Sequence, residues 1–309
     1  MQIAFIEPKY TLNKIEKTIC NNKIDFIEPK PDYNKTKADF IALDPWQDMK
    51  NCYIAPKLQP INPNRLDRGQ MLDETGQIFN RGTTNFCRDD IDWKDFGKYL
   101  KENFENLSDV DIYCFGCSTG EEAYSLAMLL KKYFDDEDFV INASDIVSDR
   151  VEKDIAQQKS GIIVDENNFL RIVQSLDLSP NQIKKYFLPN GSTSVKLSSD
   201  VVDCVTFEQN NILNSIGRIN QNKKSIVMCR NMWPYIKPEE YNGFAQELYS
   251  KLKTGSVVVI GSYDCMGECG IEFSDAFPMA LLQCGFRPIR GGQGILSREL
   301  DARLIYQKD

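Results

Sequence analysis

Apolar runs of strand length alternate with segments of helical periodicity from about residue 95 onwards. In the segment Pro238–Leu252, apolar and aromatic side chains recur on one side of a helix. Strands are expected at Asp111–Phe115, Phe139–Ala143, Ser225–Cys229 and Val257–Ile260, and helices at Glu121–Phe134, Ser148–Gln158 and Pro238–Leu252. Alternation of this kind predicts an α/β fold with a parallel sheet that is covered by helices on both faces.

Two later regions depart from the simple alternation. Short strand-like runs at Val195–Leu197 and Val205–Phe207 interrupt it, so a small β insertion is expected at about residues 186–208. Near the end of the chain, the runs Phe286–Ile289 and Ala302–Tyr306 are predicted to form an antiparallel pair at the edge of the sheet.

Residues 1 to about 75 show a different pattern, in which short apolar runs are separated by prolines. Leu12, Ile15 and Ile19 fit one face of a short helix. We expect a small α+β module of unknown role in residues 1–75 and a main domain in residues 76–309. Residues 57–80 are rich in Pro, Asn, Asp and Gly and are predicted to be a linker or long loop.

The charge balance narrows the range of partners. The 309 residues carry a net charge of -8, whereas a protein that binds nucleic acid usually presents a basic face. The first residues, MQIAFIEPKY, lack the cationic start and long apolar core of a signal peptide, and runs such as Val257–Ile260 are too short to span a bilayer. We therefore expect no nucleic-acid partner, no membrane insertion and a cytoplasmic location.

The chain contains ten cysteines and no histidine. Without a signal peptide, the cysteines are expected to be reduced thiols. Cys114 and Cys117 form a CxxC pair, but the cysteine spacings give no two matched pairs and no histidine completes a site, so no metal is expected. The absence of histidine also removes Ser-His-Asp and Cys-His chemistry and the usual general base.

The segment Cys114–Met128 has the pattern of a strand, a turn of small residues and an amphipathic helix. Gly116 and Gly120 allow a tight turn and a close approach of the backbone to a ligand, although a tight connection without a ligand gives the same pattern. The third glycine of a dinucleotide fingerprint is missing. Glu121 and Glu122 begin the helix, where they suit the helix dipole but would repel a pyrophosphate. The pattern therefore favours a cationic or hydroxyl-bearing ligand over NAD.

Asp145 follows the next expected strand and lies 25 residues after Gly120. This is close to the position of an acid that binds the ribose hydroxyls of an adenosine ligand. An acid at a strand end is also a common helix cap, but together with the first turn the position favours ribose binding.

These segments resemble motifs of the CheR-type glutamate methyltransferases of bacterial chemotaxis. The stretch CSTGEEAYSLAM is similar to the family's STGEEPYS[IL]AM. Other segments resemble family motifs in the same order: Thr84–Arg88 (TxFFR), Ser144–Ile146 with Val151–Lys153 and Ser160–Ile162 (SDID…LEKA…SGIY), Ser179–Phe187 (SPxQLxxYF), Asn211–Leu213 (NLL), Cys229–Tyr235 (CRNVxIYF), and Leu252–Gly255 followed by Ile260–Ser262 (LKPGGxLxxGHSE). The resemblance implies a class I methyltransferase with a Rossmann-like sheet, of which the antiparallel ending is typical.

The resemblance also implies a cofactor, S-adenosyl-L-methionine, and a set of site residues. The positions that match the family's cofactor-binding segments are Thr84, Arg88, Gly116, Gly120, Glu122, Asp145, Asn211, Ile212, Arg230 and Asn231. Tyr235 matches the family's tyrosine near the transferred methyl group, and Arg88, Arg230 and Tyr235 are the candidate catalytic residues. The implied substrate is a protein with a glutamate side chain, with a chemoreceptor as the family's example.

Methyl transfer to a carboxylate fits a site without histidine. A glutamate with a pKa near ~4.3 is already ionised at neutral pH, so no general base is required. The enzyme must align the carboxylate oxygen, the methyl group and the sulfur, and exclude water. Because a guanidinium holds a carboxylate by paired hydrogen bonds, Arg88 and Arg230 are candidates for fixing the incoming carboxylate or that of the cofactor, with surface salt bridges as the alternative.

Several positions differ from the family pattern. Cys87 replaces a phenylalanine, Pro234 precedes Tyr235, and the GHSE motif is Gly261-Ser-Tyr-Asp264 without its histidine. The cofactor half is therefore expected to be intact and the substrate half to have changed. Two alternatives stay open: a methyltransferase for a different nucleophile or small molecule, and a degenerate sensor that binds the cofactor without turnover.

Overall fold

The computed structural model describes residues 70–72, 78–80, 84–88, 90–135, 137–191, 193–233, 236, 238–261, 264, 277–289 and 304–309. The α+β module predicted for residues 1–75 lies outside these residues except at Gln70–Leu72, and it stays a prediction. No helix among the described residues is long and apolar enough to cross a membrane.

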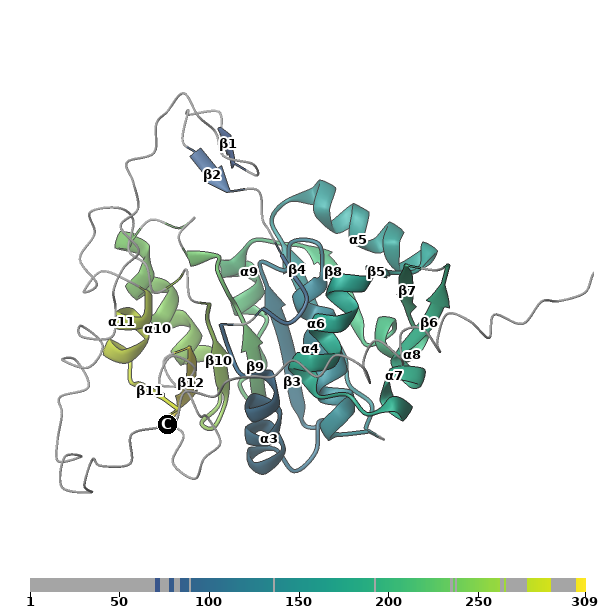
Figure 1. The fold of residues 1–309 in the computed structure, drawn as a ribbon. Coiled ribbons are helices and arrows are strands. Elements are labelled where there is room, and N and C mark those ends of the chain that lie inside the picture. The colour runs from purple at the N-terminus through teal and green to yellow at the C-terminus, as the bar shows by residue number, and fades with distance from the viewer. Residues whose placement is uncertain are drawn as a thin grey trace, which may run out of the picture. The chain divides into compact units, whose positions relative to one another are not determined.

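The main sheet has seven strands in the order β11-β12-β10-β9-β3-β4-β8 (Figure 1). Its strands are β3 (Val110–Phe115), β4 (Ile141–Asp145), β8 (Val205–Gln209), β9 (Lys224–Met228), β10 (Val257–Val259), β11 (Phe286–Pro288) and β12 (Ile305–Lys308). The strands from β10 to β8 are parallel, whereas β12 is antiparallel to both β10 and β11. The predicted Rossmann-like sheet with an antiparallel pair at its edge is confirmed.

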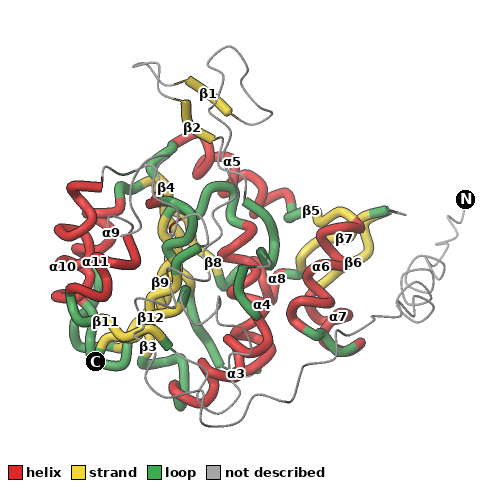
Figure 2. The backbone as a smooth tube through the Cα atoms, turned by 60° about the vertical axis from the view of Figure 1, so that its left-hand side comes forward, coloured by secondary structure: helices red, strands yellow, loops and turns green. Residues whose placement is uncertain are grey.

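Helices cover both faces of this sheet (Figure 2). One face carries α9 (Ile212–Gly217), α10 (Tyr241–Lys251) and α11 (Phe277–Gln283), and the other carries α3 (Trp93–Asn103) and α4 (Glu121–Tyr133). α5 (Ser148–Ser160) contacts β4 and β8, and the short 3-10 turn η3 (Pro238–Glu240) precedes α10. Central strand residues such as Ile112, Ile141 and Ile226 are fully buried, as continuous apolar strands between two helical layers should be.

The β insertion is an antiparallel sheet of three strands in the order β5-β7-β6. It comprises β5 (Ile163–Asp165), β6 (Phe187–Asn190) and β7 (Ser194–Leu197), with α6 (Glu166–Leu176) and α7 (Pro180–Tyr186) between β5 and β6 and α8 (Ser199–Val202) after β7. The insertion thus begins earlier than the predicted residue 186. Val205–Phe207, which the prediction assigned to it, belongs to β8 and pairs with β4 in the main sheet. Periodicity shows that a run is a strand but not which sheet it joins.

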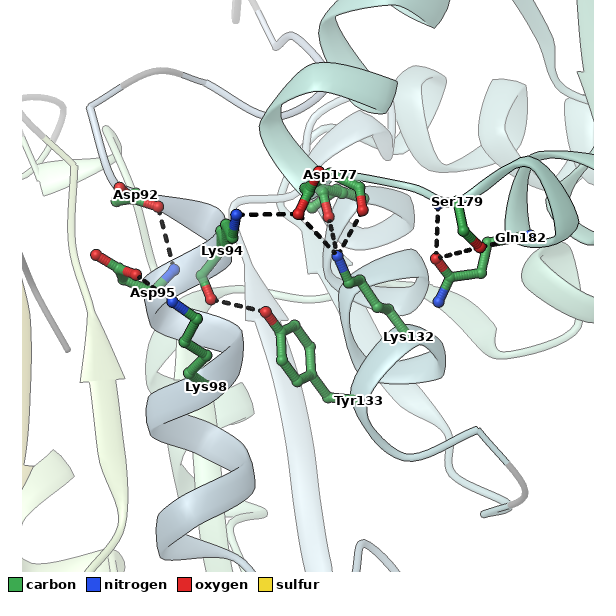
Figure 3. Close-up of polar contacts among 10 residues, drawn as sticks. Asp92, Lys94, Asp95, Lys98, Lys132, Tyr133, Asp177, Ser179 and Gln182 are labelled. Carbon is green, nitrogen blue, oxygen red and sulfur yellow. Dashed lines mark hydrogen bonds and ion pairs between the residues drawn. The ribbon is translucent and has the colours of Figure 1, made fainter.

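Three charged groups tie α3 and α4 to the end of α6 (Figure 3). Lys132 of α4 donates to the carbonyl oxygens of Leu176 and Asp177, both at 2.6 Å, and Lys94 of α3 pairs with the Asp177 carboxylate at 3.0 Å. Asp177 adopts a left-handed conformation with φ of 51°, and Lys132 binds carbonyl groups at the end of α6 that have no partner within the helix.

A two-stranded antiparallel sheet forms within residues 57–80, where a linker was predicted. Its strands are β1 (Gln70–Leu72) and β2 (Ile78–Asn80). The linker prediction is therefore wrong for these residues, because a composition rich in turn-forming residues also suits the two ends of a short β ribbon.

Candidate cofactor site

The turn between β3 and α4 is shaped by two glycines in the left-handed region. Gly116 has φ of +66° and Gly120 has φ of +81°. A Cβ atom on Gly120 would lie 2.7 Å from the Phe207 ring, and one on Gly116 would lie 3.2 Å from Cβ of Met232. Both conformation and space therefore require glycine here, and the turn brings the start of α4 to the carboxyl end of β3.

Asp145 ends β4 beside this turn and is buried. Its Oδ2 atom accepts a hydrogen bond from the backbone N–H of Ser118 at 2.8 Å, and its Oδ1 atom accepts one from Val147 at 3.0 Å. The carboxylate thus joins the turn to the start of α5, which agrees in part with the helix-cap alternative. Because a carboxylate has about four acceptor positions, two remain for ligand hydroxyl groups.

Glu122 and Arg230 are buried in contact with each other at the same edge of the sheet. Nη1 of Arg230 lies 3.3 Å from Oε2 of Glu122, and the Arg230 side chain is 0% exposed. Arg230 also pairs with Asp90 and stacks over the Trp93 ring, with 5.5 Å between the guanidinium carbon and the ring centre. Arg230 therefore lies inside the protein with two carboxylates, and the predicted surface-pair alternative does not describe it.

Burial raises the pKa of Glu122 to about 8. The positive charge of Arg88 opposes this rise, and the negative charge of Asp264 adds to it. A carboxyl group with this pKa is easily converted to its charged form by a cationic ligand.

Arg88 is half-buried, and its backbone is held on both sides. The preceding residue, Cys87, has φ of 44° and donates its N–H to Oγ of Ser125 at 2.9 Å. The Arg88 carbonyl accepts a hydrogen bond from Nε1 of Trp93 at 2.8 Å. Thr84, at the start of the same segment, is also half-buried.

The segment after β8 begins beside the end of β4, since the N–H of Asn210 donates to the Asp145 carbonyl at 2.9 Å. Asn211 is exposed and caps α9, where its Oδ1 accepts from the N–H of Asn214 at 2.9 Å, while Ile212 is half-buried. Ile146 is 67% exposed directly after Asp145. Our sequence analysis did not select Ile146, and its position directly after the candidate ribose-binding acid was the signal available.

Asn231 has φ of 57° in the turn after β9, and this turn has a partner that sequence reasoning missed. Asp264 is 2% exposed and accepts hydrogen bonds from the backbone N–H groups of Asn231, Gly261 and Trp233. The available signal was its position at the end of the segment similar to GHSE. Tyr235 lies outside the described residues, and its role stays a prediction.

Cys114, Cys117 and Cys229 are buried near Glu122, and burial raises the pKa of each thiol well above its usual value. Among the described residues, no group of three or more Cys, Asp or Glu side chains is arranged to hold a metal ion. The predicted site residues that come together are instead Arg88, Glu122 and Arg230, beside the turn that Asp145 holds.

Known proteins of one family share sequence with this chain. A model of the family "CheR methyltransferase, SAM binding domain" matches residues 82–277. The chain is 26% identical over 168 residues to chemotaxis protein methyltransferase 2 of Vibrio cholerae, covering 53% of this chain and 54% of that protein. It is 26% identical over 173 residues to a chemotaxis protein methyltransferase of Borreliella burgdorferi, covering 55% and 58%.

The chain thus spans little more than half the length of these curated relatives. Among solved structures, magnesium protoporphyrin IX methyltransferase from Synechocystis is similar with a TM-score of 0.36 and 14% identity, over 68% of this chain and 77% of that one. Because the family model covers more than half of the residues, this chain belongs to the family of CheR methyltransferases with an S-adenosylmethionine-binding domain.

Proposed function

We propose that this chain transfers a methyl group from S-adenosylmethionine to the carboxylate of a glutamate side chain in a protein substrate. The observation that carries the proposal is the buried Glu122 beside Arg230 at the carboxyl edge of the sheet, next to the turn that Asp145 holds. Ligands of open α/β sheets bind at this edge. The relatives are chemotaxis protein methyltransferases, so a chemoreceptor is the first substrate to test.

The residues present fit this cofactor. Glu122 is a buried acid suited to the cofactor's ammonium group, and Asp145 keeps acceptor positions for ribose hydroxyls. Ile146 and Ile212 offer apolar surface to the adenine ring. The remaining positions of the predicted cofactor set are assigned to the same site from the family motifs: Thr84, Gly116, Gly120, Asn211 and Asn231.

Two arginines from the predicted set have different roles in this proposal. Arg230 is fully enclosed by Asp90, Glu122 and Trp93, so it positions these groups from inside. Arg88 is half-buried and its backbone is fixed, which suits it to hold a carboxylate at the mouth of the site.

Bound S-adenosylmethionine supplies a methyl group that is activated by its positive sulfur. The chain's own contribution is to orient the acceptor carboxylate, to match the cofactor's charge with Glu122 and to exclude water. A glutamate acceptor arrives ionised, so no residue has to remove a proton. This agrees with a chain that contains no histidine.

The product distinguishes the proposed reaction from its alternatives. Purified protein is incubated with methyl-tritiated cofactor and a cell extract, and the labelled protein is then exposed to alkali. We expect volatile methanol, because carboxyl methyl esters hydrolyse in base. Label that survives alkali would identify a different nucleophile, and bound cofactor with no labelled product at all would indicate a sensor without turnover.

A further inference from the structure

We propose that Asp264 is a positioning residue of the cofactor site, which fixes the backbone turn that carries Arg230 and Asn231. This inference rests on the proposed function, because its consequence is measured as cofactor affinity. Asp264 is separated from these residues along the chain and reaches the turn from beyond the end of β10.

The Asp264 carboxylate serves three backbone donors at once. Oδ2 accepts from the N–H groups of Asn231 at 2.6 Å and Gly261 at 2.7 Å, and Oδ1 accepts from Trp233 at 3.1 Å. Pairing between β9 and β10 ends just before this point, where the Cys229 N–H donates to the Val259 carbonyl at 2.9 Å. Asp264 therefore continues the connection between the two strands after the sheet has ended.

The turn and Gly261 fit each other closely. A Cβ atom on Gly261 would lie 2.1 Å from Oδ1 of Asn231, so any larger residue would push the Asn231 side chain away. Asn231 itself is in the left-handed conformation, which costs free energy for a residue other than glycine and needs support from its surroundings. The buried hydrogen bonds from Asp264 provide that support.

The turn determines where Arg230 points. The Arg230 guanidinium pairs with Glu122 on α4 and with Asp90 in the segment before α3, and it stacks over Trp93. Since the Asp264 oxygens bind the next residue's amide, a shift of this turn moves Arg230 and alters the surroundings of Glu122. Asp264 thus acts on the cofactor site through other residues.

The Asp264 side chain can accept hydrogen bonds freely at both of its oxygens only when it is ionised, because a proton on one oxygen would occupy an acceptor position. Burial raises the pKa of Asp264 to about 7, while the three N–H groups and Arg230 oppose the rise. Within the described part of the chain, the charged and titratable groups that interact with it are Arg230, Glu122 and Cys229. An amide at this position would keep one acceptor and turn an NH2 group toward the backbone donors.

The test compares the binding of S-adenosylhomocysteine to four folded variants by calorimetry. Asp264→Asn should raise the dissociation constant at least about tenfold. Gly261→Ala disturbs the same turn without changing any charge and should act in the same direction. Asp264→Glu, which keeps the carboxylate, should bind several-fold more tightly than Asp264→Asn.

The matched control is Asp165→Ala, which removes another carboxylate that accepts a backbone N–H, in the insertion at the start of α6. It should lower the melting temperature but leave the affinity within about twofold of wild type. If wild-type protein does not bind the ligand, the proposed function fails. If wild-type protein binds and Asp264→Asn and Gly261→Ala bind equally well, the role of Asp264 is refuted. If Asp264→Asn does not fold, the affinity of Gly261→Ala decides whether the role of Asp264 stands. Equal affinities of Asp264→Glu and Asp264→Asn would also overturn the proposal.

Discussion

We expect cofactor binding to depend on pH through the charge of Glu122. Burial raises the pKa of Glu122 to about 8 although Arg230 lies 3.3 Å away, so we expect the carboxyl group to carry a proton in much of the free protein at pH 6 to 7.5. A cationic ligand requires the ionised form, and the apparent dissociation constant then carries the factor 1 + 10^(pKa − pH). This factor falls from about 100 at pH 6.0 to about 4 at pH 7.5, so affinity should rise roughly 20-fold with pH.

As pH rises, the contribution of Glu122 to the free energy of unfolding changes in the opposite direction to its contribution to cofactor affinity. Burial raises the Glu122 pKa from 4.5 to about 8, which corresponds to about 5 kcal/mol between the charged and neutral forms in the native state. Between these two pKa values the native protein binds more protons than the unfolded chain. The contribution of Glu122 to the free energy of unfolding therefore falls as pH rises from about 4.5 to 8.

Calorimetry with S-adenosylhomocysteine measures how the binding affinity changes with pH. This ligand keeps the ammonium group of the cofactor, and its own amine titrates only near ~8. Binding at pH 7 should release close to one proton, which is seen by comparing buffers of different ionisation enthalpy. Glu122→Gln should remove the larger part of the pH dependence and leave the part that comes from Asp264, whose pKa burial raises to about 7, whereas the matched variant Glu121→Gln should retain both parts. A flat affinity in wild-type protein, or an unchanged slope in Glu122→Gln, would refute the reasoning.

Three further substitutions test separate parts of the site and fold. Asp145→Ala should weaken S-adenosylhomocysteine binding by about 10- to 100-fold, since hydrogen bonds to a charged acceptor are worth roughly 1.5–3 kcal/mol, and unchanged affinity in calorimetry would contradict the ribose role. Arg88→Lys keeps the positive charge but loses the planar guanidinium that binds a carboxylate by two hydrogen bonds, so turnover should drop sharply with an unchanged melting temperature. A turnover rate equal to that of wild type would assign Arg88 to surface pairing. Lys132→Met removes the donor to the Leu176 and Asp177 carbonyls and should lower the free energy of unfolding by about 1–3 kcal/mol in urea titrations, with cofactor affinity retained.

The sheet was predictable because buried parallel strands are continuous apolar runs. β3 and β9 lie within one residue of their predicted bounds. β4 begins at Ile141, two residues later than the predicted Phe139, and extends to Asp145. Val140 lies just before β4 and is 48% exposed, so hydrophobicity alone did not locate the residue at which β4 begins.

Short strands were harder to place because their partners decide their sheet. β8 was assigned to the insertion, but its Val205 pairs with Ile141 in the main sheet, while β5 joins the insertion at Ile163. Each of these strands has five or fewer residues, too few for periodicity to distinguish one sheet from another. The pairing depends on contacts between distant segments.

The ion pairs of the site could not be read from spacing at all. The family motifs identified Glu122 and Arg230, but not that these two residues meet, nor that Asp90 and Asp264 join them from two other segments. Burial of several acids around one enclosed arginine explains why the pKa values of Glu122 and Asp264 are both raised. Burial raises both pKa values although Arg88 opposes the rise at Glu122 and Arg230 opposes it at Asp264, so we expect a further positive group, such as the cofactor's ammonium group, to favour the ionised form of Glu122. In this chain without histidine, we expect the carboxylates to make the site sensitive to charge and pH.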